Sequence, residues 1–473
     1  MSVFPRLASA PSLVRTLSVP PEFLSEQECK ALLDTVASLA TGGGVSTISL
    51  ESQWLGGVQW VRNRTRVASD LRFNSLGLNR LIRGRSQWIT TTRLDTDGLR
   101  DAVKAAERSI RFFGPRHEWD DRMQYNNDPM LQPILWSEAT YGFSPERRLG
   151  LVRDLVGMAE TDGFLSAGDV GVTAQGTATV STDGRLRYYA STEAECSITV
   201  RDRRGTASGW AGVNHYDFAK IDPAKIAATA LDKARRSAQA VAIEPQHYTA
   251  ILEPQAVSDL MVPLTAWLAR DKAEQGLGPF AGRQPGTSKI NERVMDPRLT
   301  LRSDPLDPDG GFIPFDADDG TPYRSVNWIE AGVLRELAYG RYYAVTMLHQ
   351  PFPLLNPMSF RLTPVPGVST ASVETMIANT QLGVLVTRFN GVQILDIDSI
   401  TCGGNTRDGL WLIEKGKISK AIRNFRFRDS VLGALNRIEQ IGVPCRVFTP
   451  GRACVMPALT VRDFNFTGLA DAV

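Results

Sequence analysis

Hydrophobic positions spaced three and four residues apart near the start of the chain predict an amphipathic helix. Its apolar face comprises Leu32, Leu33, Val36 and Leu39. Ser25, three residues before Glu28, fits the first position of a capping box. Residues 45–92 are rich in Val, Ile, Thr and Trp, which favour strands, and residues 94–112 return to helical spacing. The first block therefore predicts a helix, several strands and a second helix.

The same order of patterns recurs further along the chain. Residues 147–163 have helical spacing, residues 170–212 alternate like a meander of strands, and residues 221–240 form an Ala-rich helical pattern. We interpret residues 25–242 as an α/β N-terminal domain with a possible internal repeat of residues 25–112 and 145–240. Residues 1–24 lack a continuous apolar stretch, which predicts a flexible N-terminal arm.

The composition changes near residue 243, where prolines flank a short strand, and residues 243–473 are predicted to form a β-rich C-terminal domain. One helix is expected over residues 255–272, kinked at Pro263. Further on, turns rich in Gly, Pro and Asp separate strand-like runs, and a late helix is expected over residues 429–441. The predicted fold class is α+β: duplicated helix, strand-meander and helix units, followed by an antiparallel β-barrel-like or sandwich domain with few helices.

Composition and charge exclude several classes of function. The 473 residues carry 53 Lys and Arg against 51 Asp and Glu, and the formal net charge of +2 gives no reason to expect a nucleic-acid partner. No run reaches the roughly 18 apolar residues that a membrane span needs, so no membrane partner is expected. Scattered cysteines favour reduced thiols and a cytoplasmic location. These are Cys29, Cys196, Cys402, Cys445 and Cys454.

The residues that usually carry catalysis form no familiar motif. The four histidines are far apart, and His117-Glu118 is followed by WDDR rather than by a second histidine. Glycine-rich nucleotide motifs and a GxSxG nucleophile elbow are missing. Residues 296–320 contain seven aspartates, for which solvated turns are the simpler interpretation and oxygen-only cation ligation the alternative. Cys445 and Cys454 lack partner histidines, so buried apolar roles are favoured over metal ligation.

Several ordered motifs in the C-terminal half resemble one peptidase family. LEPQAVSDLM begins the series, and FDADDGTP then leads into the strand pair IEAGVL. LGVLVTRFNG, GLWLIEKGKI, ALNRIEQIGV and ALTVRDFNFTG follow in that order. Over residues 253–468 the chain is similar to the TldD/PmbA (TldD/TldE) peptidase family. The duplicated N-terminal half is consistent with this resemblance.

The resemblance also implies where a metal site would lie. Metal-bearing members carry HExxxH on the helix after the first strand of the C-terminal domain, and a later cysteine ligand. Here the corresponding positions hold Val262, Pro263 and Trp267, while Cys445 or Cys454 lies near the cysteine position. A lone thiolate without the two imidazoles does not make an ordinary zinc site. We therefore expect degenerate metal positions, no cofactor in this chain and no catalytic residue.

LGVLVTRFNG is closer to the non-catalytic PmbA/TldE kind of chain than to the metal-bearing kind. The resemblance implies a non-catalytic subunit of a zinc metallopeptidase complex, forming a heterodimer with a TldD-like subunit that binds the zinc. The complex would cleave unfolded or short peptides, or process modified precursors, with extended peptide held on strand edges. Two alternatives stay open: a self-contained hydrolase that uses Cys445, Cys454 or His215, and a homodimeric peptide-binding scaffold without activity.

Overall fold

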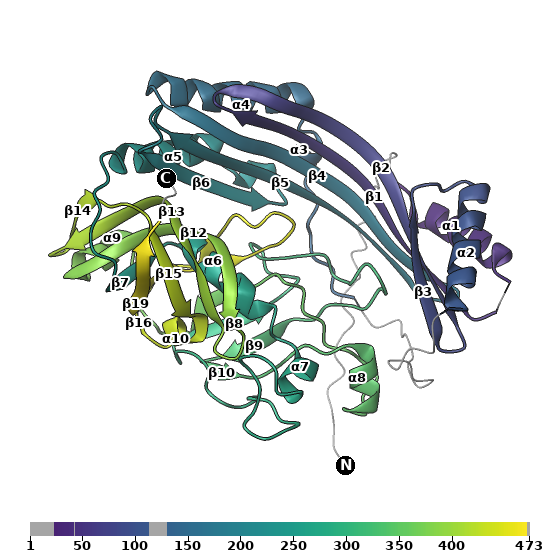
Figure 1. Cartoon of the computed structure of the whole chain (residues 1–473). Coiled ribbons are helices and arrows are strands. Elements are labelled where there is room, and N and C mark those ends of the chain that lie inside the picture. Colours follow the sequence, from purple (N-terminus) through teal and green to yellow (C-terminus); the bar gives the residue numbers. More distant parts are fainter. Residues whose placement is uncertain (1–22, 42, 113–129, 471–473) are drawn as a thin grey trace, which may run out of the picture.

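This computed structural model describes residues 23–41, 43–112 and 130–470. Two strand meanders build one curved sheet in the N-terminal half (Figure 1). The meanders are β1 (Val45–Val61), β2 (Arg64–Ile82) and β3 (Arg85–Thr91), then β4 (Leu165–Ser181), β5 (Leu186–Arg201) and β6 (Ser208–His215). Because β1 pairs with β4, the antiparallel order is β3-β2-β1-β4-β5-β6. Residues 1–22 of the predicted arm, and His117-Glu118, lie outside the described residues.

Each meander lies between two helices, so the order of elements occurs twice and the predicted duplication of the fold is confirmed. The helices are α1 (Glu26–Leu39) and α2 (Thr96–Ile110), then α4 (Pro145–Thr161) and α5 (Pro223–Arg236). Two short turns, α3 (Glu138–Tyr141) and η1 (Phe218–Lys220), accompany the second unit. α1 starts with the predicted capping box, in which the side chain of Ser25 accepts from the backbone of Glu28 and the Glu28 carboxylate accepts in return.

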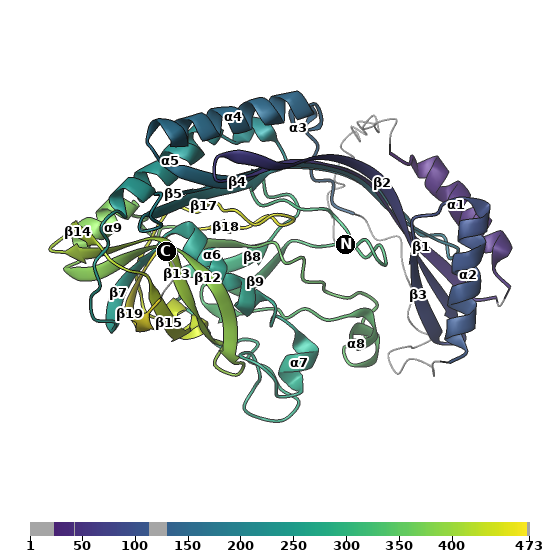
Figure 2. The ribbon, with the colours of Figure 1, turned by 45° about the horizontal axis from the view of Figure 1, so that its top comes forward.

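The four long helices cover the convex face of the curved sheet, and the concave face turns toward the C-terminal half (Figure 2). Strand alternation explains this division, because every second side chain of β4 and β5 is apolar and packs under α4 and α5. Gly209 on β6 lets the helix α5 pack directly against the sheet, because a Cβ atom at this position would lie 2.1 Å from the carbonyl oxygen of Ala230 on α5. The alternate side chains of β4 and β5, which do not pack under the helices, line the concave face.

A closed ring of five strands forms the core of the C-terminal half. The ring consists of β7 (His247–Leu252), β19 (Leu459–Leu469), β15 (Phe425–Ser430), β13 (Thr401–Glu414) and β12 (Leu382–Asp396). β14 (Lys417–Ala421) pairs with β13, and β16 (Ile438–Ile441) pairs with β19. All pairings are antiparallel except β7 with β12, which a long connection separates. The predicted α+β class and barrel-like C-terminal domain are therefore confirmed.

A second, smaller sheet lies beside the barrel. Its strands, in spatial order, are β10 (Val333–Leu334), β9 (Val326–Glu330), β8 (Leu299–Ser303), β11 (Arg361–Pro364), β18 (Val455–Met456) and β17 (Cys445–Arg446). The helices of this half are short: α6 (Pro254–Thr265), α7 (Arg270–Glu274), α8 (Arg341–Thr346), α9 (Val373–Asn379) and α10 (Val431–Leu435). A large apolar cluster joins the barrel, α6 and the smaller sheet.

Two predicted helices are shorter in the structure than the sequence pattern suggested. The helix expected over residues 255–272 ends at Thr265, and a separate helix, α7, begins only at Arg270. The predicted kink at Pro263 is absent because the helix does not continue: it ends at Thr265, two residues after the proline, whose nitrogen cannot donate a hydrogen bond. The helix expected over residues 429–441 ends at Leu435, because Ile438–Ile441 is drawn into pairing with β19.

Hydrogen bonds connect the two halves at several points. The FDADDG turn docks on the sheet, with Thr179 Oγ1 donating to the Ala317 carbonyl at 2.7 Å and Arg185 to that of Asp319 at 2.6 Å. Trp411 Nε1 donates to the Arg236 carbonyl at the end of α5, at 3.1 Å. The halves therefore enclose the space beneath the concave face. Within the described ranges, no helix is long and apolar enough to cross a membrane.

Candidate functional site

A cavity of 490 Å³ lies between the concave face of the N-terminal sheet and loops of the C-terminal half. The strands contribute mainly polar side chains: Gln53, Thr173, Gln175, Glu193 and Glu195. The opposite wall contains aromatic and basic side chains: Phe312, Tyr323, Arg446 and Arg452. A space of this size, with a polar floor made of strands, can accommodate a few residues of extended peptide.

The register of β4 and β5 places these polar groups together. Thr173 lies opposite Glu193, and Gly171 lies opposite Glu195. Because side chains alternate along a strand, Ala194 and Cys196 point to the other face, where they are buried under the helices. Gly171 leaves room for its partner, since a Cβ atom there would come within 2.6 Å of a Glu195 carboxylate oxygen.

Glu193 and Asn214 fix one wall of the cavity. The Glu193 carboxylate accepts from the Asn214 amide and from the backbone N–H of Gly451, at 3.1 Å and 3.2 Å to its two oxygens. The Asn214 side chain accepts from Thr449 N at 2.8 Å and donates to the Arg452 carbonyl at 3.0 Å. Burial raises the pKa of Glu193, although these hydrogen bonds oppose the effect. The loop that carries Arg452 is thus held on the sheet.

Glu195 and Asp169 form a carboxyl pair on the concave face. Burial raises the pKa of Glu195 to about 8, and the hydrogen bond and charge of Asp169 act in the same direction. At neutral pH the Glu195 carboxyl group therefore stays largely protonated. Glu195 thus presents the cavity with a neutral carboxyl group, which can donate a hydrogen bond.

Replacing Glu195 by Gln should make the protein relatively more stable as the pH rises. A carboxyl group whose pKa is raised in the folded state binds its proton more tightly there than in the unfolded chain, so stability falls between the ordinary value of 4.5 and about 8. Glutamine cannot ionise, and we expect the variant to gain about 1–3 kcal/mol over wild type between pH 5 and pH 9. Urea unfolding at several pH values measures the difference, with Glu160→Gln on exposed α4 as the control. A difference that stays constant with pH would contradict the raised pKa of Glu195.

The residues singled out for a self-contained hydrolase do not assemble. Cys454 is buried, and burial raises the pKa of its thiol. Cys445 is exposed, but the protein atoms around it and the charge of Glu253 also raise its thiol pKa. Burial and Arg446 lower the pKa of His215 to about 4, and its Nδ1 accepts from the backbone of Asp217 at 2.9 Å. Across the described ranges, no hydrogen bond joins either thiol to this imidazole, so the geometry favours no Cys–His nucleophile.

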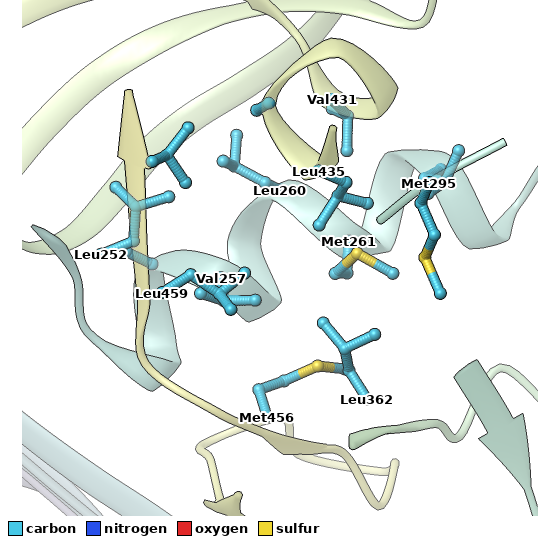
Figure 3. Close-up of a cluster of buried hydrophobic side chains, with 14 of the residues drawn as sticks. Leu252, Val257, Leu260, Met261, Met295, Leu362, Val431, Leu435, Met456 and Leu459 are labelled. Atoms are coloured by element: carbon cyan, nitrogen blue, oxygen red, sulfur yellow. The ribbon is translucent and has the colours of Figure 1, made fainter. Parts of the chain in front are cut away.

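The positions that the family resemblance assigns to HExxxH lie on and just after α6. The buried face of α6 packs into the apolar cluster of Figure 3 through Val257, Leu260 and Met261. Val262 and Pro263 are partly exposed on the same helix, and none of Val262, Pro263, Trp267 and Cys445 lines the cavity. Hydrocarbon and indole groups cannot ligate zinc, so Val262, Pro263 and Trp267 do not fit the metal that the family resemblance implies. Nowhere in the described part of the chain do three or more His, Cys, Asp or Glu side chains group as a metal site.

Trp267 has the spacing of the apolar face of the helix expected over residues 255–272, but it does not lie on that helix. It follows the end of α6 and is only partly buried against the apolar cluster. The ammonium group of Lys272 lies 5.0 Å from its ring centroid, which places a cation over the indole face.

The aspartate-rich segment is more structured than solvated turns. Asp307 is buried, and its carboxylate accepts from Arg361 and from the backbone N–H groups of Asp309 and Gly310 at 3.0 Å each. Asp316 accepts from Asp318 N at 3.0 Å and shapes the turn that docks on the sheet. Solvated turns were therefore the wrong interpretation for Asp307, whose charge is paired with arginine rather than with water.

Sequence reasoning missed the carboxyl pair and the cavity. The run TEAEC contains the signal, because strand alternation places Glu193 and Glu195 on the face opposite Ala194 and Cys196. Asp169 could not be added from sequence, since its proximity depends on the register between β4 and β5.

Comparison with known proteins agrees with the fold and with the motifs. The family models described as PmbA/TldA metallopeptidase C-terminal domain and central domain match residues 245–468 and 141–238. The chain therefore belongs to the PmbA/TldD family. No curated protein sequence matches it.

Solved structures share the fold along nearly the whole chain. TldE from Thermococcus kodakarensis superposes with a TM-score of 0.80 at 15% identity, covering 93% of this chain and 100% of that one. A putative modulator of DNA gyrase from Bacteroides thetaiotaomicron gives 0.79 at 18% identity, covering 94% and 100%. Another from Thermotoga maritima gives 0.78 at 16% identity, covering 93% and 100%. The fold of this chain is thus TldE-like.

Replacing Pro263 by Ala should leave the protein folded and functional. Alanine restores the backbone N–H that proline lacks in the last turn of α6, and no chemistry is assigned to this position. We expect the free energy of unfolding to stay the same or to rise by up to about 1 kcal/mol. Thermal unfolding measures the stability, and peptide cleavage by the heterodimer that the family resemblance implies measures the function. A folded variant whose complex has lost activity would show that this helix has a role in chemistry after all.

Proposed function

We propose that this chain is the non-catalytic subunit of a TldD/TldE-type zinc metallopeptidase, and that a TldD-like subunit supplies the hydrolytic centre. One feature of the sequence carries the proposal: Val262, Pro263 and Trp267 occupy the positions that the family resemblance assigns to the metal ligands and the general base. None of the three side chains offers a metal ligand or a proton acceptor. The TldE-like fold supports a subunit of this kind.

The contribution of this chain would be to bind and orient substrate. Gln53 and Gln175 offer amide donors and acceptors to a peptide backbone, and Thr173 lies between them and the carboxyl groups. Phe312 and Tyr323 provide apolar surface on the other side of the cavity. A peptide held in this way would have fewer conformations to lose before cleavage, which is how positioning raises the rate. Unfolded or short peptides, including modified precursors, are the substrates that fit.

Cleavage assays with the separate and mixed subunits test the proposal. The chain alone should not cleave an unstructured peptide, whereas its mixture with a TldD-like subunit that carries HExxxH should. As a control, changing the motif's glutamate to glutamine in that partner should abolish the activity of the mixture, because the general base would be lost. Cleavage by the chain alone would refute the proposal. A chain that binds peptide but forms only homodimers, and stays inactive in every mixture, would instead be a scaffold.

A further inference from the structure

The first half of β2 is an open edge strand. Of residues 64–73, all except Ser69 are exposed, whereas residues 76–78 are buried. One side of this segment pairs with β1, but β3 pairs only with residues 76–82 on the other side. Among the residues that the structure describes, no backbone hydrogen bond reaches the outer edge of residues 64–73. A free edge of this length presents a row of unpaired N–H and C=O groups to another strand.

The same segment has an uncovered apolar strip. Val67, Leu71 and Phe73 lie opposite Gln59, Leu55 and Gln53 of β1, so they face the concave side next to the cavity. Their exposed fractions are 48%, 57% and 40%. Apolar side chains grouped along an open edge commonly mark an interaction site.

Charge distinguishes between the possible occupants of this edge. Residues 64–73 contain three arginines and a single carboxylate, Asp70, which is already held by Arg148 at 2.6 Å. Arg64 and Arg66 are exposed and form no ion pair within the described ranges. A second copy of this chain would bring its own arginines against these, whereas a strand rich in carboxylates would complement them.

We propose that the open edge of β2 binds an extended polypeptide segment in which apolar residues alternate with acidic ones. The added strand would satisfy the free backbone groups, cover Val67, Leu71 and Phe73 with its apolar side chains, and place its carboxylates near the arginines. The site belongs to the N-terminal sheet of this chain, so it does not depend on the proposed peptidase partner.

Binding of two labelled ten-residue peptides to the full chain tests this site. One peptide alternates Glu with Val and the other alternates Lys with Val; fluorescence anisotropy measures the dissociation constants. We expect the Glu–Val peptide to bind about tenfold or more tightly than the Lys–Val peptide, and the preference to weaken in 1 M salt. The double variant Arg64→Glu/Arg66→Glu should reverse the preference. Arg203→Glu/Arg204→Glu, which makes the same charge change in the exposed turn before β6, should retain it.

Leu71→Asp supplies an independent test of the apolar strip. Because Leu71 is exposed, the variant should fold normally by circular dichroism, yet bind the Glu–Val peptide about tenfold more weakly. Equal affinity for both peptides would overturn the proposal, as would equal loss in the Arg203/Arg204 control. Failure to bind either peptide, or a concentration-dependent dimer that excludes the Glu–Val peptide, would also overturn it, because the edge would then have another occupant.

Discussion

Replacing Asp307 by Ala should lower the free energy of unfolding by about 3–5 kcal/mol, because the Arg361 guanidinium would lose its partner in a buried environment. Asp307 is 6% exposed. Its carboxylate also accepts from two backbone N–H groups at the start of the loop that leads to the cavity wall. The variant should therefore lose both the ion pair and the shape of this loop. Urea unfolding at neutral pH measures the loss.

Asp309→Ala is the matched control for this prediction. Asp309 is exposed and contacts the same arginine at 3.3 Å, so its removal should cost less than about 1 kcal/mol. Equal losses in the two variants would show that the buried pair has no special role.

Acid should diminish the contribution of Asp307. Burial alone would raise its pKa, but the hydrogen bonds from Arg361 and the backbone outweigh burial and lower it. Stability from a lowered carboxyl pKa is present above the ordinary value of 3.8 and is lost as the pH falls through the folded-state value. The difference between wild type and Asp307→Ala should therefore shrink below pH 3.8. A difference that grows in acid would contradict the assigned ion pair.

Replacing Thr173 by Trp should reduce peptide cleavage by the proposed complex about 10- to 100-fold while the fold is retained. Thr173 lies on the cavity floor opposite Glu193, and an indole there would occupy the space proposed for the peptide backbone. The variant should still associate with the TldD-like subunit, because the change points inward. Steady-state kinetics with an unstructured peptide measures the loss.

Thr370→Trp makes the same substitution at an exposed loop position outside the cavity. It should leave cleavage and the melting temperature nearly unchanged. Full activity of the Thr173→Trp complex would show that substrate does not pass through this cavity, whereas loss of folding in that variant would be visible as a lowered melting temperature.

Local signals predicted the elements that depend on nearby residues. α1 begins where Ser25 and Glu28 indicated, because a capping box is complete within four residues. The repeated order of helix, meander and helix was also evident, since each unit has its own hydrophobic period. These features require no knowledge of distant contacts.

Elements that depend on distant partners were less predictable. Ile438 has the spacing of a helix that continues from α10, but its backbone pairs with Val461 of β19. Trp267 fits the apolar face of a longer helix, yet the chain turns after Thr265 and the Asn356 side chain donates to the Thr265 carbonyl at 2.8 Å. Tertiary pairing overrides local periodicity in both cases.

The candidate site likewise has features that depend on local sequence and features that depend on distant contacts. The assignment of Val262, Pro263 and Trp267 to the metal positions needs only one motif and its spacing along the chain, and it stays a prediction. The cavity could not be identified from the sequence, because it arises only when the register of β1, β4 and β5 meets the loops around Phe312 and Arg452.

The zinc content of the purified chain tests the central claim most directly. The chain, prepared without its partner and equilibrated with zinc before dialysis, should retain far less than one equivalent by mass spectrometry, and an HExxxH-bearing TldD-like subunit treated identically should retain about one. Stoichiometric zinc in the lone chain, together with cleavage of an unstructured peptide, would contradict the account.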